Sequence, residues 1–299
     1  MSQSVELSII IVSYNTYELT KQSIDSIFEH TKGLSFEIVV VDNASTDKSV
    51  KYIRGLSKKS NVKVYFSKSN RGFAGGNNIG MKMANGRYLL LLNSDTKLTN
   101  PIFKEILSFM DSHRDVGIFS PLLKNPDGSP QASGGYFPGL AKVFSWMFFL
   151  EDVPFLSEAI KPFHPRMSYF KKERYLDWVV GAFFLMRREV YEDVGEIDEK
   201  YFMYTEEVDY SYRAKMGGWR VFYSPRWSIV HYGGASSNRE YPLLQEYKGV
   251  KRFFEKYYPK WQYPLLRVFL KLGSLARVVL FGILRPSYVT IYAKAFKLA

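Results

Sequence analysis

The first third of the chain contains, in order, Ser13-Tyr14-Asn15, Val39-Val40-Val41-Asp42-Asn43, Asn70-Arg71-Gly72-Phe73-Ala74-Gly75-Gly76-Asn77-Asn78 and Leu92-Asn93-Ser94-Asp95. The first, second and fourth pieces each follow a short apolar run, and helical stretches separate the runs. This alternation predicts parallel strands whose carboxyl ends meet along one edge of a sheet. Because ligands of open α/β sheets bind at that edge, the repeated polar residues indicate a nucleotide and a metal ion held in one crevice.

The surrounding sequence predicts an α/β fold with a mainly parallel, doubly wound sheet. Apolar runs rich in β-branched residues favour strands, and spaced apolar positions favour helices. We expect strands at residues 7–13, 36–41, 62–66, 87–92 and 116–120, and helices at residues 16–30 and from residue 101. The pattern loosens between residues 121 and 176, which we interpret as an insertion or flexible loop that covers a site.

Regular structure is expected again from Trp178 to Met186. A helix around Tyr210 and two short strands, at residues 220–223 and 228–231, are predicted to follow. The expected division is a domain of residues 1–240, with a nucleotide-binding half to about residue 120 and an acceptor half after it. Residues 241–299 form a separate helical region in this scheme.

The composition restricts the class of protein. The 299 residues carry a formal net charge of +12, which favours an anionic partner such as nucleotide phosphates, nucleic acid or an acidic membrane surface. Cysteine is absent, so disulfides and thiolate metal sites are excluded. The N-terminus has no basic region and only a short apolar run, which is not typical of a signal peptide. We therefore expect a cytoplasmic location.

The C-terminal region is basic and apolar. Residues 265–284 are interrupted by Arg267, Lys271 and Arg277, and a central charge disfavours a membrane span by about 2.5–3.5 kcal/mol. An amphipathic helix on an anionic membrane surface fits this pattern better. The alternative is a pair of C-terminal helices packed on the domain or on a second subunit.

Four groups of polar residues are candidates for chemistry. Asp42 either accepts hydrogen bonds from a nucleobase or ribose, or forms an Asx turn that caps the next helix. The glycines and Arg71 of the Asn70–Asn78 segment suit a phosphate- or sugar-binding loop. Asp95 is placed to hold Mg²⁺ or Mn²⁺. His231, which closes a short apolar strand before two glycines, is a second metal candidate, with a structural role as its alternative.

Three carboxylates lie within four residues at Glu206, Glu207 and Asp209. In a helix, Glu206 and Asp209 share one side and Glu207 is turned about 100° away. Acidic residues at a helix N-terminus stabilise the helix through its dipole, which is the structural alternative. A glutamate near a metal ion and a phosphate is otherwise a candidate general base.

Taken together, the series resembles the inverting family 2 glycosyltransferases of the GT-A fold, most closely the rhamnosyltransferase-like subgroup. The Asn70–Asn78 segment is the most specific match. The resemblance covers roughly residues 5–240. It implies these nucleotide- and donor-binding residues: Ser13, Tyr14, Asn15, Asp42, Asn43, Asn70, Arg71, Gly72, Gly75, Asn77, Asn93 and Ser94.

Asn93-Ser94-Asp95 stands where the family has its D-x-D-type metal motif, with Asn93 in place of the first aspartate and Asp95 as the principal ligand. The acceptor-side strand corresponds to Asp177, Trp178, Gly181, Ala182 and the Arg187-Arg188 pair. The segment Glu206–Asp209 matches the family's E-D-x-D motif, and its second residue, the usual base, is here Glu207. The segment from His231 to Gly234, with Ser236 and Ser237, resembles the late motif whose histidine touches metal or diphosphate.

The resemblance implies an inverting transferase that depends on Mg²⁺ or Mn²⁺ and uses dTDP-rhamnose or a UDP-sugar as donor. The implied acceptor is a lipid-linked saccharide or a glycan in bacterial or archaeal surface polysaccharide assembly. The expected location is peripheral, on the inner face of the cell membrane, with no nucleic-acid partner and with a homodimer as an option. The alternatives are a sugar-nucleotide-forming nucleotidyltransferase, for which Ser13-Tyr14-Asn15-Thr16 offers no basic triphosphate loop, and a non-enzymatic basic module that binds membrane or nucleic acid.

Overall fold

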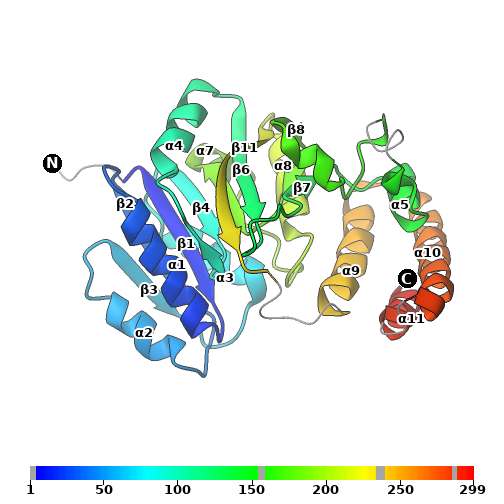
Figure 1. The fold of residues 1–299 in the computed structure, drawn as a ribbon, viewed down its shortest axis with the longest axis horizontal. Helices are drawn as coiled ribbons and strands as arrows, with labels where there is room; N and C mark the ends of the chain where they lie inside the picture. The colour runs from blue at the N-terminus through cyan, green and yellow to red at the C-terminus, as the bar shows by residue number, and fades with distance from the viewer. Residues whose placement is uncertain (1–4, 154–158, 234–239, 285–287) are drawn as a thin grey trace. The chain divides into compact units, whose positions relative to one another are not determined.

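A computed structural model describes residues 5–153, 159–233, 240–284 and 288–299 (Figure 1). Backbone contacts divide the chain into two compact units. The first, which we call the sheet unit, comprises Met1–Ser133 and Phe170–Ala235. The second, the helical unit, comprises Gly134–Tyr169 and Ser236–Ala299.

The sheet unit contains one large mixed sheet. Its strands run in the order β3-β2-β1-β4-β10-β6-β11-β5, and β8 pairs with β11. They are β1 (Leu7–Ser13), β2 (Phe36–Asp42), β3 (Val62–Phe66), β4 (Tyr88–Leu92), β5 (Thr96–Lys97), β6 (Val116–Lys124), β8 (Arg174–Leu176), β10 (Phe183–Arg187) and β11 (Arg220–His231). The short β9 (Trp178–Val179) precedes β10. Strands β3, β2, β1 and β4 are mutually parallel, whereas β10 runs antiparallel between β4 and β6.

The helices of this unit follow the strands as the sequence pattern indicates. They are α1 (Tyr17–His30), α2 (Ser49–Leu56), α3 (Gly72–Met83), α4 (Phe103–Ser112), α7 (Arg188–Val194) and α8 (Glu206–Met216). The α/β class and the mainly parallel sheet are confirmed. The two short strands expected at residues 220–223 and 228–231 form one strand, β11, whose pairing with β6 shifts between Ser224 and Ser228.

Strand β1 is buried on both sides, which explains its continuous apolar run. Ile9 and Ile11 belong to the main hydrophobic core together with Ile24 and Ile27 of α1. Because side chains alternate along a strand, Ile10 and Val12 point to the opposite face, where α3 packs. Helix α1 covers the near face of the sheet in Figure 1.

The glycine-rich segment differs from the loop that we expected. Helix α3 already begins at Gly72, so most of the segment is helical. A Cβ atom on Gly76 would lie 2.6 Å from Val12 Cγ1, and one on Gly80 would lie 2.2 Å from Ile10 Cγ2. Residues four apart share one helix face. These glycines therefore let α3 approach β1 closely.

The helical unit contains the expected C-terminal helices and more. Its elements are β7 (Gly134–Gly135), α5 (Leu140–Met147), the 3₁₀ turn η1 (Leu150–Asp152), α9 (Glu240–Tyr257), α10 (Gln262–Leu284) and α11 (Val289–Leu298). A second 3₁₀ turn, η2 (Met167–Lys171), lies at the junction of the two units in the sequence.

Residues 134–169 therefore group with the C-terminal helices, although we placed them in the catalytic domain as an insertion or loop over a site. The reason is a buried arginine: Arg277 of α10 donates hydrogen bonds to the carbonyl oxygens of Trp146 (2.7 Å) and Met147 (2.6 Å) in α5. Among the residues that the structure describes, no helix is long and apolar enough to cross a membrane.

The packing of α3 on β1 gives a stability prediction. In an open helix, Gly→Ala is stabilising by up to about 1 kcal/mol. Gly80→Ala should instead lower the free energy of unfolding by about 1–3 kcal/mol, because the added methyl overpacks against Ile10. Chemical denaturation of the purified variants measures the difference.

The matched control is Gly55→Ala in α2, where nothing lies within 4 Å of the added Cβ. This variant should be neutral or slightly more stable than the parent. If Gly80→Ala were as stable as Gly55→Ala, the proposed role of the glycines in α3 would be wrong.

Candidate active site

The carboxyl ends of β1, β2 and β4 lie next to one another, as the sequence predicts. Ser13, the last residue of β1, pairs with Asp42, the last residue of β2. The backbone N–H of Asn43 donates to the carbonyl oxygen of Ser13 (2.8 Å). The first and second sequence pieces therefore meet at one edge of the sheet.

A chain of hydroxyl groups joins the first piece to the fourth. Ser13 Oγ is buried and lies 2.9 Å from Thr20 Oγ1. Thr20 Oγ1 is 3.1 Å from Thr16 Oγ1, which is 3.2 Å from Ser94 Oγ. The Ser94 side chain, predicted on the donor side, is thus held against the start of α1.

Asp42 combines both roles that we considered. Its Oδ2 accepts a hydrogen bond from the backbone N–H of Ser45 (3.2 Å), which is the Asx turn. Its Oδ1 is buried and has no hydrogen-bond partner among the described residues. A buried carboxylate oxygen without a partner is costly, so this oxygen is suited to accept a ligand N–H or hydroxyl. Tyr14, which follows the Ser13 that pairs with Asp42, is 46% exposed. Asn15 Oδ1 accepts from the backbone N–H of Thr46 (2.7 Å).

Asn43 and Asn70 hold the approach to α3 in place. Asn43 Nδ2 donates to Asn70 Oδ1 (2.9 Å) and to the carbonyl oxygen of Gly72 (3.1 Å). Asn43 Oδ1 accepts from the backbone N–H of Arg71 (3.0 Å), and Asn70 Oδ1 also accepts from that of Gly72 (2.9 Å). These amides shape the donor-side backbone, while their direct contact with a nucleotide stays a prediction.

Arg71 has a partner that the sequence did not indicate. Its guanidinium lies 2.6 Å from Glu199 Oε2, and both side chains are partly exposed. Partial burial raises the pKa of Glu199, but hydrogen bonds from Asn78 and Arg71 outweigh it, so the pKa of Glu199 is lowered. Glu199 is therefore the negative group that holds Arg71 in this structure.

Close packing fixes the other donor-side glycines. Gly72 has a φ of +68°, and an added Cβ would lie 2.1 Å from the carbonyl oxygen of Phe202. A Cβ on Gly75 would lie 2.6 Å from Arg71 Cβ. The Asn77 side chain donates to the carbonyl oxygen of Phe73 within α3 (3.0 Å). Gly72, Gly75 and Asn77 thus have structural roles at the start of this helix.

The two predicted metal ligands come together across the sheet. Strand β11 pairs with β5, which places His231 opposite Thr96. His231 Nε2 lies 3.4 Å from Asp95 Oδ1, although the two residues are distant in the sequence. No cluster of three or more histidine or acidic side chains suited to a metal ion occurs within the described ranges. The protein therefore offers a pair of ligands here.

Gln131 determines which nitrogen of His231 faces Asp95. Its Nε2 donates to the carbonyl oxygen of His231 (2.7 Å) and to Asn125 Oδ1 (2.7 Å). Its Oε1, 2.8 Å from His231 Nδ1, must therefore accept a hydrogen from that nitrogen. In a neutral imidazole the lone pair is then on Nε2, the atom that faces Asp95. The sequence analysis missed Gln131, which lies in the irregular stretch before residue 134 and carries no motif.

The residues expected on the acceptor side divide into two groups. The carbonyl oxygen of Ala182 accepts a hydrogen bond from the backbone N–H of Asn93 (3.1 Å). A Cβ on Gly181 would lie 2.8 Å from Phe73 Cζ. Gly181 and Ala182 therefore border the donor-side residues. By contrast, Asp177 forms an ion pair with Lys215 (2.7 Å), and Trp178 is buried.

The Arg187-Arg188 pair is not at the candidate site. Arg187 pairs with Tyr88 at the opposite end of β4 and donates to the backbone carbonyl of Val116 (2.8 Å). Arg188 donates to the carbonyl oxygen of Gly86 (2.7 Å). Both arginines stabilise the fold at the other edge of the sheet, which is a correction to the expected acceptor-side role.

Helix α8 begins at Glu206, as the acidic segment predicts, after two residues in the left-handed region. Tyr204 and Thr205 have φ values of 69° and 74°. Such conformations cost non-glycine residues about 1–3 kcal/mol each and are found often at functional sites. The preceding turn is held to α3, because the backbone N–H of Phe73 donates to the carbonyl oxygen of Phe202 (2.9 Å).

The three carboxylates of α8 have different environments. Glu206 is 4% exposed, and its Oε2 has no hydrogen-bond partner among the described residues. Burial, and then the charge of Glu207, raises the pKa of Glu206 well above its usual value. Glu207 is half-buried. Asp209 is fully buried and paired with Arg213 (3.0 Å), so it anchors α8 and is not placed as a base.

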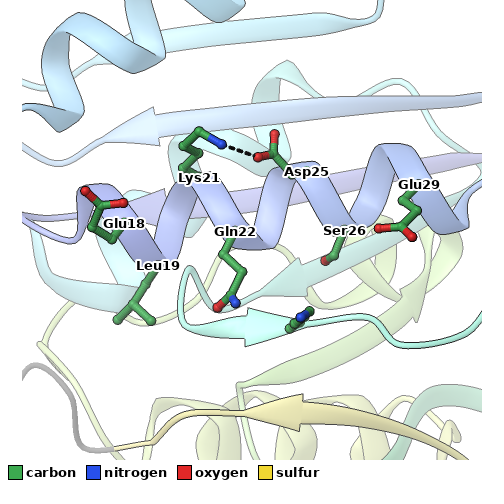
Figure 2. A pocket seen from close by; sticks show the side chains of 8 residues that line it. Glu18, Leu19, Lys21, Gln22, Asp25, Ser26 and Glu29 are labelled. Carbon is green, nitrogen blue, oxygen red and sulfur yellow. Dashed lines mark hydrogen bonds and ion pairs between the residues drawn. The ribbon is translucent and has the colours of Figure 1, made fainter.

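An open groove of about 440 Å³ lies elsewhere, along the exposed side of α1 (Figure 2). It is lined by side chains such as Glu18 and Glu29, and an ion pair joins Lys21 to Asp25 across one helical turn. None of the predicted site residues lines it. Residues Gly234, Ser236 and Ser237 of the late motif lie outside the described residues.

Two curated proteins are similar in sequence to part of this chain. Agl10 of Haloferax volcanii, a low-salt glycan biosynthesis hexosyltransferase, is 28% identical over 214 residues, covering 70% of this chain and 62% of that protein. The N-acetylglucosaminyl-diphospho-decaprenol L-rhamnosyltransferase of Mycobacterium tuberculosis is 27% identical over 200 residues, covering 63% and 61%. The matches thus span about three fifths of these relatives.

Two solved structures share the fold at low identity. The mannosyltransferase PcManGT of Pyrobaculum calidifontis, in complex with GDP-Man and Mn²⁺, has a TM-score of 0.61 at 16% identity, covering 99% of this chain and 86% of that one. GalNAc-T7 with UDP, GalNAc and Mn²⁺ has a TM-score of 0.59 at 16% identity, covering 84% and 48%. Both are transferases of the GT-A fold.

The family model for glycosyl transferase family 2 matches residues 8–195, the part of the chain that runs from β1 through α7. It includes the strand ends at Ser13 and Asp42 and the candidate ligand Asp95. The chain belongs to glycosyl transferase family 2 and has the GT-A fold.

Proposed function

We propose that the chain transfers a sugar from a nucleoside-diphosphate sugar to an acceptor hydroxyl, with inversion at the anomeric carbon. One observation carries the proposal. A buried Asp42 oxygen without a hydrogen-bond partner among the described residues lies at the same edge of the sheet as the chain of hydroxyl groups from Ser13 to Ser94. That chain leads to Asp95 and His231. The donor is proposed to be dTDP-rhamnose or a UDP-sugar. GT-A neighbours were solved with UDP or GDP-Man.

The Asp95–His231 pair fits Mg²⁺ or Mn²⁺. A hard cation in such enzymes is held by one or two protein ligands, with substrate phosphates and water in the other positions. Gln131 aims the Nε2 lone pair of His231 at Asp95, an arrangement that is repulsive unless a cation or a proton lies between them. A bound ion would neutralise charge on the departing diphosphate. Mn²⁺ in the neighbours' crystals supports this choice.

Asp42 is proposed to receive the nucleoside. Its buried Oδ1 can accept one hydrogen bond from a base N–H or a ribose hydroxyl, which would satisfy the carboxylate. The exposed ring of Tyr14, which follows the Ser13 that pairs with Asp42, offers a surface for the base. Arg71 is proposed to turn from Glu199 toward the diphosphate, since both side chains are partly exposed and such a pair contributes little stability.

Glu207 is proposed as the general base and Glu206 as its protonated neighbour. Burial raises the pKa of Glu206 well above its usual value, which favours its protonated form, and we place the negative charge of the pair on the less buried Glu207. Glu207 takes the proton of the acceptor hydroxyl as that oxygen attacks the anomeric carbon. The bond from the anomeric carbon to the diphosphate oxygen breaks, and the nucleoside diphosphate leaves with the electron pair.

The acceptor is proposed to be a lipid-linked saccharide or a glycan in surface polysaccharide assembly, bacterial or archaeal. The Mycobacterium tuberculosis relative is named for a decaprenol-diphosphate-linked sugar, and the Haloferax volcanii relative for glycan biosynthesis. A peripheral position on the inner face of the cell membrane would suit such an acceptor. A homodimer stays a prediction.

Substitution of the two glutamates tests the base assignment. Glu207→Gln should lower the transfer rate by about 10²–10⁴-fold, the usual contribution of a general base, while nucleotide binding is kept. Glu206→Gln is the matched control, because its amide resembles the protonated carboxyl in size and charge, and it should stay within about threefold of the parent rate. Steady-state transfer assays with the donor that binds measure both rates.

A reversed result, with Glu206→Gln inactive and Glu207→Gln active, would assign the base to Glu206. If neither substitution slowed transfer, α8 would not supply the base at all.

Gln131 gives a separate prediction about the metal site. Gln131→Leu removes the acceptor for His231 Nδ1 and should weaken Mn²⁺ binding by about 10–100-fold, as is typical when such a supporting group is lost. Gln131→Glu keeps an acceptor oxygen for His231 Nδ1 but loses the two hydrogen bonds that Nε2 donates, so it should recover part of the Mn²⁺ affinity that the leucine variant loses. The electron paramagnetic resonance of free Mn²⁺ measures affinity without reference to activity.

Equal Mn²⁺ affinity in the parent and the leucine variant would show that Gln131 has no part in the metal site. Equal loss in both variants, with unchanged melting temperatures, would contradict the assigned role of its acceptor oxygen.

A further inference from the structure

Helix α10 of the helical unit carries a row of exposed apolar side chains. Leu265, Val268, Leu272, Leu275 and Val279 follow one another at intervals of three and four residues and are 40–65% exposed (41%, 47%, 48%, 50% and 63%). We call them the α10 stripe. Trp261, in the turn before the helix, is 63% exposed. Soluble surfaces rarely keep such a continuous apolar row without a partner.

The α10 stripe is a single face of the helix. At about 100° per residue its five members fall within an arc of about 80° and extend over about 21 Å. The opposite face is packed within the helical unit: Leu266 and Leu270 are fully buried, and a Cβ on Gly273 would lie 2.5 Å from Met147 Cβ. The exposure of the stripe is therefore not a consequence of a loosely packed helix.

The charge around the stripe has one sign. From residue 256 to the C-terminus the sequence has eight lysines and arginines and no acidic residue. Lys260 and Arg267 are exposed, and Lys271 is half-buried, 5.7 Å from the ring of Phe296. By their helical positions, Arg267 and Lys271 both flank the same side of the stripe. The fully buried Arg277 is directed away from it, to backbone carbonyls of α5.

We propose that the α10 stripe is a docking surface for a bilayer that contains anionic phospholipids. An apolar helix face flanked by cations lies in the interface with its apolar side chains below the headgroups and its cations at the phosphates. Trp261 beside Lys260 is the pairing found at membrane–water interfaces. A second copy of the chain fits less well, because two such faces would bring like charges together with no acidic residue on α10 or α11 to balance them.

Vesicle binding by the full chain tests the proposal independently of sugar transfer. Phosphatidylcholine vesicles are compared with vesicles of phosphatidylcholine and phosphatidylglycerol (7:3), with binding measured by sedimentation at low and high salt. The parent should bind the anionic vesicles at least about 10-fold more tightly and lose most of that preference at high salt. Leu272→Glu/Leu275→Glu should weaken binding to anionic vesicles at least about 10-fold.

The matched control is Tyr65→Glu/Met216→Glu, which adds the same charge at two exposed side chains of the sheet unit (42% and 64% exposed). It should bind vesicles within about threefold of the parent. A neutral variant, Val268→Ser/Leu272→Ser/Leu275→Ser, repeats the test without added charge, and circular dichroism checks that each variant folds.

The proposal would be overturned if the parent failed to bind anionic vesicles. It would also be overturned if the parent and both stripe variants bound them equally. A parent dimer, measured by light scattering, that the stripe variants convert to a monomer without any vesicle binding would overturn it as well. That result would assign the stripe to a second copy.

Discussion

The parallel pairing of β1 with β2 on one side and β4 on the other is the constraint on which the rest of the site depends. It brings Ser13 beside Asp42 and directs the chain after β4 to the same edge. The hydrogen-bonded pairing of these strands already places the side chains at their ends close to one another. The close approach of α3 to β1, permitted by Gly76 and Gly80, then brings Asn70 and Arg71 to that edge, where both are hydrogen-bonded to Asn43.

The sequence was most informative where local pattern and tertiary position agree. Strand β1 has a run of β-branched residues from Ile9 to Val12 because both of its faces are buried, and its bounds were predicted correctly. Asp95 and His231 were each proposed as ligands from their position after an apolar strand, and the pairing of β11 with β5 explains why they meet. Their roles as ligands remain a proposal.

Other features could not be predicted, because they depend on contacts between distant segments. Glu199 and Gln131 lie in irregular stretches, and only the folded chain shows that they bind Arg71 and His231. The glycines of α3 have the composition of a loop, yet the side chains of Ile10 and Val12 require them in a helix. Residues 134–169 resemble an insertion in sequence, but α5 within them is bound to α10 by hydrogen bonds from the buried Arg277.

The carboxylates of α8 are chemically alike but lie in different electrostatic environments. Glu206 and Glu207 are adjacent, but burial, and then the charge of Glu207, raises the pKa of Glu206, whereas Glu207 itself is only half-buried. Asp209, one turn further, is neutralised by Arg213 and serves the fold. Two carboxylates whose environments differ in this way are a common basis for acid and base roles in enzymes. Arg71 carries the positive charge that suits a diphosphate, and a cation proposed to bind at the Asp95–His231 pair would add to it.

The central claim is that the strand ends form one site for a nucleoside diphosphate and a metal ion. Melting temperatures of the full chain with UDP, dTDP and GDP, each with and without Mn²⁺, test it most directly, because a ligand that binds only the folded state raises the melting temperature. The account predicts a rise with UDP or dTDP that requires Mn²⁺ and that disappears in Asp95→Asn. No rise with any nucleotide, or the same rise without Mn²⁺ and in Asp95→Asn, would contradict it.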